Sequence, residues 1–181
     1  MPWDKRVNVT IYTDGSCSCN PGPGGWAAIV MCNNKYKRLT GNALHTTNNR
    51  MELTAVIEGI KYVSVPANIR IVTDSTYVMV DKGKWNKMCA RKKLPNKELW
   101  AEFIKAAKDG NHSITYEHVY GHTGHEFNEM ANELAQQETS KAKAAAFEAG
   151  IRYEVNHELL DKLNDEIRKV MNGDDCDETD S

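Results

Sequence analysis

Three carboxylates stand at points of the chain from which a folded sheet could bring them together. Asp14 follows an alternating strand pattern, Asp74 ends the apolar run IRIVTD, and Glu52 lies in the first turns of a predicted helix. Like charges within a few ångströms raise each other's pKa, so such a cluster is tolerated when a divalent cation neutralises it. Oxygen ligands without a Cys or His partner favour Mg²⁺ or Mn²⁺. Spacing alone leaves open that each Asp is a turn-former or a helix cap.

A second candidate feature is a basic block within residues 82–97. It contains no acid, and its cations are Lys82, Lys84, Lys87, Arg91, Lys92, Lys93 and Lys97. The formal net charge of −2 conceals it, because the last nine residues carry five acids, and the rest of the chain has 23 Lys and Arg against 20 Asp and Glu. Such a block repels itself unless an anion lies nearby, which indicates a phosphate-facing surface. A merely solvated loop is the alternative that this run alone leaves open.

The elements that must position these residues are predicted from hydrophobic periodicity and turn chemistry. Strands are expected at 7–13, 25–31, 35–43, 69–74 and 113–119, with CSCNPGPGG as a turn between the first two. Helices are expected near 96–109 and 127–138, and a longer one begins after Thr46 or Thr47 and ends before Pro66. This order of strands and helices predicts an α/β domain with a mixed sheet.

Composition changes beyond this domain, which we expect to span residues 1–140. Residues 141–172 form a predicted helical extension, in which apolar residues at helical spacing indicate an amphipathic helix over 157–171. The segment 173–181 is strongly acidic and is expected to be disordered.

Several classes of protein are excluded by the composition. Hydrophobic residues make up 40% and charged residues 27%, which is typical of a globular protein with a real core. No apolar run approaches the ~18 residues needed to cross a bilayer, and no secretory signal is expected at the N-terminus. The five cysteines are odd in number and irregularly spaced, so they are interpreted as free thiols of a cytoplasmic protein without a zinc site.

Four blocks of this sequence resemble type 1 ribonuclease H, in the family's order and at its usual intervals. They are YTDGSCSCNPGPGGWAAIV, TTNNRMELTAVIEGI, IVTDSTYV and VYGHTGHEFNEMANELA, and the match covers residues 7–138. The resemblance implies a ribonuclease H-like fold with a central five-stranded mixed sheet flanked by helices. It also implies endonucleolytic hydrolysis of the RNA strand of RNA–DNA hybrids with two Mg²⁺ ions, which Mn²⁺ can replace, by a monomeric cytoplasmic enzyme.

The resemblance also assigns roles to individual positions. Asp14, Glu52 and Asp74 match three metal-binding catalytic carboxylates, and His122 matches a mobile-loop histidine thought to assist proton transfer or product release. Asn20, Thr47, Asn48 and Asn49 match positions that contact the hybrid, although loop capping is the alternative role for the asparagines. Trp85 matches an aromatic residue that lines the groove for the DNA strand, and Lys92 and Lys93 are expected to contact phosphates.

The sequence departs from the family's pattern at the fourth acidic position, where Asn132 replaces an Asp. Glu133 cannot take over, because one step along a helix turns a side chain by roughly 100°. Asn132 keeps a carbonyl oxygen for coordination but removes one negative charge, so the second ion should bind more weakly. The substitution is either natural or deliberate, and the sequence favours the deliberate origin slightly, because shape is kept while charge is lost.

The basic block is shorter than in family members that carry a long basic protrusion, which affects expected affinity more than chemistry. Two rival functions remain. One is a hybrid-binding protein with weak or absent catalysis, which Asn132 suggests. The other is a DNA-cleaving nuclease of the same fold, such as a transposase or junction resolvase, against which TTNNRMEL and the histidine loop argue.

Overall fold

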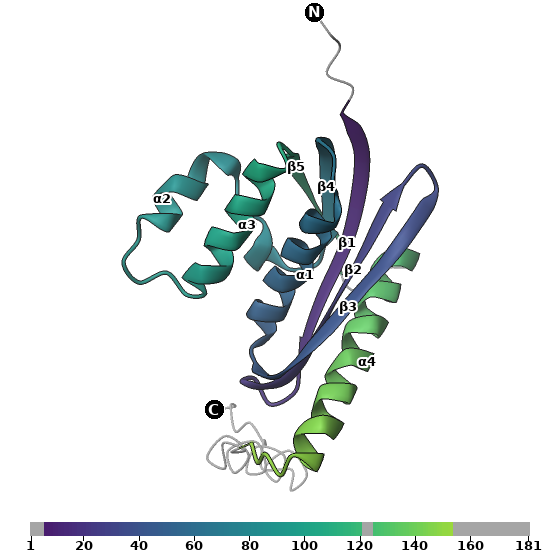
Figure 1. The fold of residues 1–181 in the computed structure, drawn as a ribbon, viewed down its shortest axis with the longest axis vertical. Helices are drawn as coiled ribbons and strands as arrows, with labels where there is room; N and C mark the ends of the chain where they lie inside the picture. The colour runs from purple at the N-terminus through teal and green to yellow at the C-terminus, as the bar shows by residue number, and fades with distance from the viewer. Residues whose placement is uncertain (1–5, 121–124, 154–181) are drawn as a thin grey trace, which may run out of the picture. The chain divides into compact units, whose positions relative to one another are not determined.

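The computed structural model describes residues 6–120 and 125–153, and within them five strands form one mixed sheet (Figure 1). The strands are β1 (Val7–Cys17), β2 (Gly22–Cys32), β3 (Lys35–Thr46), β4 (Ala67–Thr73) and β5 (Ser113–His118). Their order is β3-β2-β1-β4-β5, with antiparallel pairing among β1, β2 and β3 and parallel pairing of β4 to β1 and β5. The predicted fold class is therefore confirmed.

Helices cover both faces of this sheet (Figure 1). The main ones are α1 (Asn48–Tyr62), α3 (Lys97–Asp109) and α4 (Glu126–Glu148), and the basic block contains the short helices η2 (Lys82–Lys84) and α2 (Trp85–Cys89) after η1 (Thr76–Val78). Alternation along β1 sends Ile11 towards α1, where its side chain meets Gly59, and sends Tyr12 towards Phe127 of α4. The main core lies between the sheet and α1 and α3.

The turn predicted between the first two strands is shorter than expected. Ser16 and Cys17 pair with Gly25 and Gly24, so both strands extend into the glycine-rich segment. A Cβ at Gly25 would lie 2.5 Å from the backbone of α4, at the Ala135 carbonyl oxygen and the Thr139 nitrogen. The glycine therefore serves close packing of a helix on a strand rather than a turn.

Helix α4 is held on the sheet by buried polar contacts. The Glu138 carboxylate accepts hydrogen bonds from Asn42 at 2.6 Å and Thr40 at 3.3 Å on β3, and it pairs with Lys141 at 2.6 Å. The Thr139 hydroxyl donates to the Ser16 carbonyl oxygen at 3.2 Å. These contacts fix the middle of α4 against β3 and the end of β1.

The end of α4 differs from the prediction, because the helix continues past residue 138 to Glu148. The segment KAKAAAFEA is rich in strong helix formers, and Ala142 and Ala146 keep one face buried. The domain boundary expected at residue 140 thus falls inside α4, and the first compact unit runs to Ile151. The predicted helix at 157–171 and the acidic tail lie outside the described residues. No helix among the described residues is both long and apolar enough to cross a membrane.

Candidate active site

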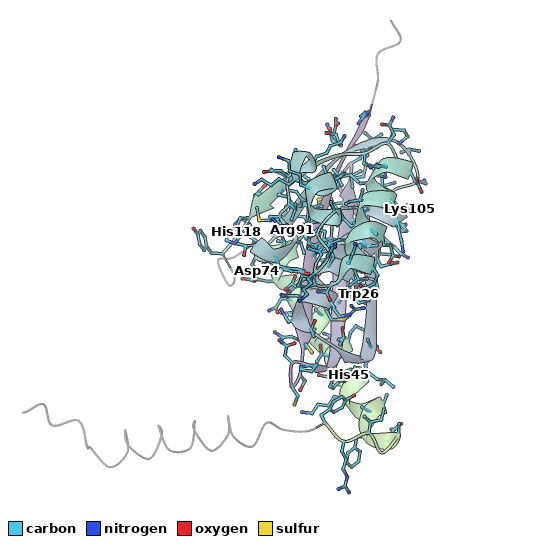
Figure 2. All side chains as sticks on the ribbon, turned by 90° about the vertical axis from the view of Figure 1, so that its left-hand side faces the viewer. Trp26, His45, Asp74, Arg91, Lys105 and His118 are labelled. Carbon is cyan, nitrogen blue, oxygen red and sulfur yellow. The ribbon has the colours of Figure 1, made fainter. Side chains whose placement is uncertain are left out.

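The three carboxylates predicted to meet do so at one end of the sheet. One oxygen each of Asp14, Glu52 and Asp74 lies within 4.8 Å of the others. Asp14 lies inside β1, paired with Ala27, rather than at the end of the strand as the sequence suggested. Asp74 directly follows β4, the parallel neighbour of β1, and its carbonyl oxygen lies 3.2 Å from the His118 ring nitrogen Nε2 (Figure 2). Parallel pairing of β1 and β4 therefore brings the two Asp residues together.

Glu52 reaches this cluster because α1 begins directly against β1. A Cβ at Gly15 would lie 2.3 Å from the Glu52 backbone nitrogen, so only glycine permits this approach. The helix start is secured by Thr47, whose hydroxyl accepts from the Arg50 amide at 3.4 Å. Asn20 adds a second cap, because its side-chain oxygen accepts from the Asn48 amide at 3.2 Å.

Burial makes this cluster electrostatically costly. Asp14 and Glu52 are 8% and 5% exposed, whereas Asp74 is more open to solvent. Burial, then the charge of Asp74, raises the pKa of Asp14 to about 7, although the Gly15 amide donates to its carboxylate at 2.9 Å. Burial, then the charges of Asp14 and Asp74, raises the pKa of Glu52 to about 9.

The donor set fits a hard divalent cation. Every group in the cluster offers carboxylate oxygen, and Oε2 of Glu52 is buried without a hydrogen-bond partner. A cation would supply that partner and offset the repulsion that raises both pKa values.

Asn132 lies at the same site. It lines a pocket of about 260 Å³ together with the three carboxylates, so the fourth position of the family pattern meets the other three in space. Its side-chain oxygen accepts a hydrogen bond from Gln136, one turn further along α4, at 2.9 Å. His122 lies outside the described residues.

Apart from Trp85, the residues expected to contact nucleic acid divide into two groups. Asn20, Thr47 and Asn48 have capping or positioning contacts, including a 3.4 Å hydrogen bond from the Asn48 amide group to Glu52. Asn49, next to them, is exposed, as are Lys92 and Lys93 in the basic block. Contact of all these residues with nucleic acid stays a prediction.

The prediction for Trp85 is wrong. Its side chain is 3% exposed, its indole N–H donates to the Val80 carbonyl oxygen at 3.0 Å, and its ring packs edge-on against Phe103. The ring therefore belongs to the core and offers no face to a base or sugar. The chain between α1 and α3 folds back onto the core at this point, which position within a basic sequence could not reveal.

The pocket residues that were not identified from the sequence include two of α4, Asn128 and Glu129. A signal for Asn128 was present, since it precedes Asn132 by four residues and so shares its helix face. No motif in this sequence pointed to Glu129.

Comparison with known proteins agrees with this geometry. The sheet order, the helices on both faces and the acidic pocket define an α/β protein of the ribonuclease H-like class. A family model described as RNase H matches residues 6–140. Ribonuclease H of Rhodospirillum rubrum is 44% identical over 147 residues, which are 77% of this chain and 87% of that protein. The chain therefore belongs to the RNase H family.

Solved structures show the same fold. LC9-RNase H1, described as a type 1 RNase H with the type 2 active-site motif, superposes with a TM-score of 0.66 at 26% identity, over 76% of this chain and 74% of that one. LC11-RNase H1, solved in complex with an RNA/DNA hybrid, has a TM-score of 0.58 at 21% identity over 75% and 99% of the two chains.

The raised pKa values predict how stability depends on pH in the absence of metal. The folded state holds protons on Asp14 and Glu52 more tightly than the unfolded chain, so their contribution is complete below about pH 4 and is lost as pH rises towards 9. Glu52→Gln should remove the larger part of this loss of stability, because the pKa of Glu52 is raised further than that of Asp14. With EDTA, we expect the variant to melt several degrees above the parent at pH 8 and to differ little at pH 4.

Thermal unfolding between pH 4 and pH 9 measures this effect. Glu58→Gln, on the same helix but away from the pocket, is the control and should follow the parent. If the melting temperatures of the parent and Glu52→Gln differed by the same amount at every pH in this range, Glu52 would not be a buried carboxylate repelled by its neighbours.

Proposed function

We propose that this chain cleaves the RNA strand of RNA–DNA hybrids endonucleolytically at the pocket formed by Asp14, Glu52, Asp74 and Asn132. The observation that carries the proposal is the convergence of three carboxylates from β1, α1 and the end of β4 within 4.8 Å. Family membership supports the same chemistry, and one structural neighbour was solved with an RNA/DNA hybrid bound. Relatives named ribonuclease H also make a purely binding protein the less favoured alternative.

Asp14, Glu52, Asp74 and Asn132 are the groups that would hold the metal, with Mg²⁺ as the proposed ion and Mn²⁺ as a substitute. When bound, a pair of such ions activates the attacking water and stabilises the leaving 3′-oxygen. All three carboxylates are coupled by charge, since Asp74 raises the pKa of Asp14 and both aspartates raise the pKa of Glu52. Asp14 would serve as the ligand common to both ions, Glu52 and Asp74 would each complete one side, and Asn132 would add a weak ligand.

The protein's own groups prepare the site for this chemistry. The Gly15 amide orients the Asp14 carboxylate, and Asn48 orients that of Glu52. Because Asp14 and Glu52 hold protons near neutral pH, loading of the pocket releases protons from them. His122 is proposed to assist proton transfer or product release.

Recognition of the hybrid is proposed to involve two surfaces. Asn20, Thr47, Asn48 and Asn49 lie where β2 begins and α1 begins, close to Glu52, and amide groups can both donate to and accept from ribose 2′-hydroxyls. The basic block supplies phosphate contacts through exposed lysines. We also propose that the protein acts as a monomer in the cytoplasm.

A cleavage assay tests this function. Labelled RNA–DNA hybrid, duplex DNA and duplex RNA of one sequence are incubated with the full chain and Mg²⁺, Mn²⁺ or EDTA. Cleavage of the RNA strand of the hybrid alone, with either metal, is expected. Cleavage of duplex DNA would favour the transposase or resolvase alternative. Absence of cleavage with either metal would favour a protein that binds the hybrid without cleaving it.

The basic block should govern affinity rather than chemistry. Replacing both Lys92 and Lys93 by Ala removes up to two phosphate contacts, so the slope of log K against log salt for hybrid binding should flatten by up to about 1.8. The rate at saturating hybrid should change little, because neither residue lines the acidic pocket.

A matched control replaces Lys35 and Lys37, which are exposed on β3 at the opposite end of the strands from Asp14. The control should keep the parent's slope. An unchanged slope in the Lys92 and Lys93 variant would mean that these lysines are solvated and make no phosphate contact.

A further inference from the structure

The side chain of Asn128 is buried at the active-site pocket without a partner for its oxygen. The residue is 5% exposed, and its Oδ1 has no hydrogen-bond partner. The other two buried polar side chains of α4 are satisfied, since Glu138 accepts from Asn42 and Thr139 donates to Ser16. Asn128 therefore differs from its neighbours on the same buried helix face.

A buried amide oxygen without a partner destabilises the folded state, because it loses its hydrogen bonds to water and gains none in the protein. Packing of α4 on the sheet does not call for a polar side chain here, because its other buried positions, apart from Glu138 and Thr139, are alanines, including Ala131 and Ala135. Asn128 also lines the acidic pocket, one turn before Asn132 and on the same side of the helix. The missing partner can therefore come from whatever enters the pocket.

We propose that Asn128 is a positioning residue whose side-chain oxygen accepts a hydrogen bond from a water molecule on the divalent cation held by the carboxylates. This inference rests on the proposed function, because it needs the cation. Mg²⁺ dehydrates reluctantly and keeps several waters in protein sites. A water whose lone pair binds a cation is left with hydrogens to donate, so it requires acceptors nearby.

The residue type fits this role. Three carboxylates already concentrate negative charge in the pocket, and a fourth buried carboxylate would add to their repulsion before the metal binds. An amide oxygen accepts a hydrogen bond without adding charge. Asn128 also lies on the side of the pocket where Asn132 supplies a neutral ligand, which makes support of bound water most important there.

The test compares variants by metal binding rather than by cleavage. Asn128→Leu keeps the approximate size without polar atoms, Asn128→Ala truncates the side chain, and Asn128→Asp keeps acceptor oxygens. Two controls lie on the same helix, namely Gln137→Ala, which is exposed, and Thr139→Ala, whose hydroxyl has partners. Calorimetric titration with MnCl₂ or MgCl₂ alone gives the dissociation constants, and melting with and without metal gives the metal-induced stabilisation.

We expect Asn128→Leu and Asn128→Ala to weaken metal binding about tenfold, as for other outer-shell partners of metal ligands. Metal-free Asn128→Leu should melt no lower than the parent, whereas Asn128→Asp should bind metal at least as tightly as the parent. Gln137→Ala should match the parent, and Thr139→Ala should lose the same stability with and without metal.

Metal affinities of Asn128→Leu and Asn128→Ala within twofold of the parent would overturn the inference and make Asn128 a packing residue. The same conclusion would follow if Asn128→Asp bound metal as weakly as Asn128→Leu. A parent chain that binds neither ion would instead contradict the metal site of the proposed function, so the two failures are distinguishable.

Discussion

Asp14→Asn should abolish hydrolysis of RNA–DNA hybrids while the fold is preserved. The amide keeps an oxygen that can accept from the Gly15 backbone N–H, now at 2.9 Å, so the local geometry of β1 has no reason to change. The lost charge is coupled to both other carboxylates, so we expect the whole metal site to be weakened. We expect a rate loss of at least about a thousandfold, or ~4 kcal/mol of transition-state stabilisation.

Single-turnover cleavage with saturating Mg²⁺ measures this loss, and thermal unfolding in EDTA checks the fold. The metal-free variant should melt at or above the parent's temperature at pH 8, because a buried repelled charge is gone. Asp109→Asn, on the surface of α3 and paired with Lys105, is the control and should cleave like the parent. Cleavage by Asp14→Asn within tenfold of the parent would remove Asp14 from the site.

Asn132→Asp should raise hybrid cleavage by at least an order of magnitude at saturating Mg²⁺, equivalent to about 1.4 kcal/mol. The side chain already lines the pocket with the three carboxylates, and Gln136 can donate to a carboxylate as it now donates to the amide oxygen. The added charge should also lower the Mg²⁺ concentration needed for half-maximal rate. Mn²⁺, which binds such ligands more tightly, should partly rescue the Asn132 form.

Without metal, Asn132→Asp should be unfavourable to the protein rather than favourable. A fourth carboxylate at this pocket is uncompensated in EDTA, so Asn132→Asp should gain no activity and should unfold at a lower temperature than the parent at pH 8. Glu133→Gln changes charge on the exposed neighbouring position and is the matched control. Equal rates for Asn132→Asp and the parent at every metal concentration would show that the amide already suffices as a ligand, or is none.

Local pattern predicted much of the scaffold because it depends on properties of neighbouring residues. Alternation placed β1, helical spacing placed α1 and α3, and the capping chemistry of Thr46 or Thr47 marked the start of α1, for which the structure uses Thr47. Element ends were less accurate, since β1 continues through Asp14 and α4 continues to Glu148. Strand ends depend on pairing with a neighbour and helix ends on the surface beneath them, and neither is local.

The types and order of the acidic residues were set by the sequence, and with them the divalent-metal chemistry and the family. Their meeting within 4.8 Å was decided only in three dimensions, by parallel pairing of β1 with β4 and by the missing side chain at Gly15. Tertiary structure also decided that Trp85 packs into the core and that Asn128 faces the pocket unpartnered. Burial and hydrogen-bond satisfaction depend on what other segments bring to a side chain, and the sequence around a residue does not contain that information.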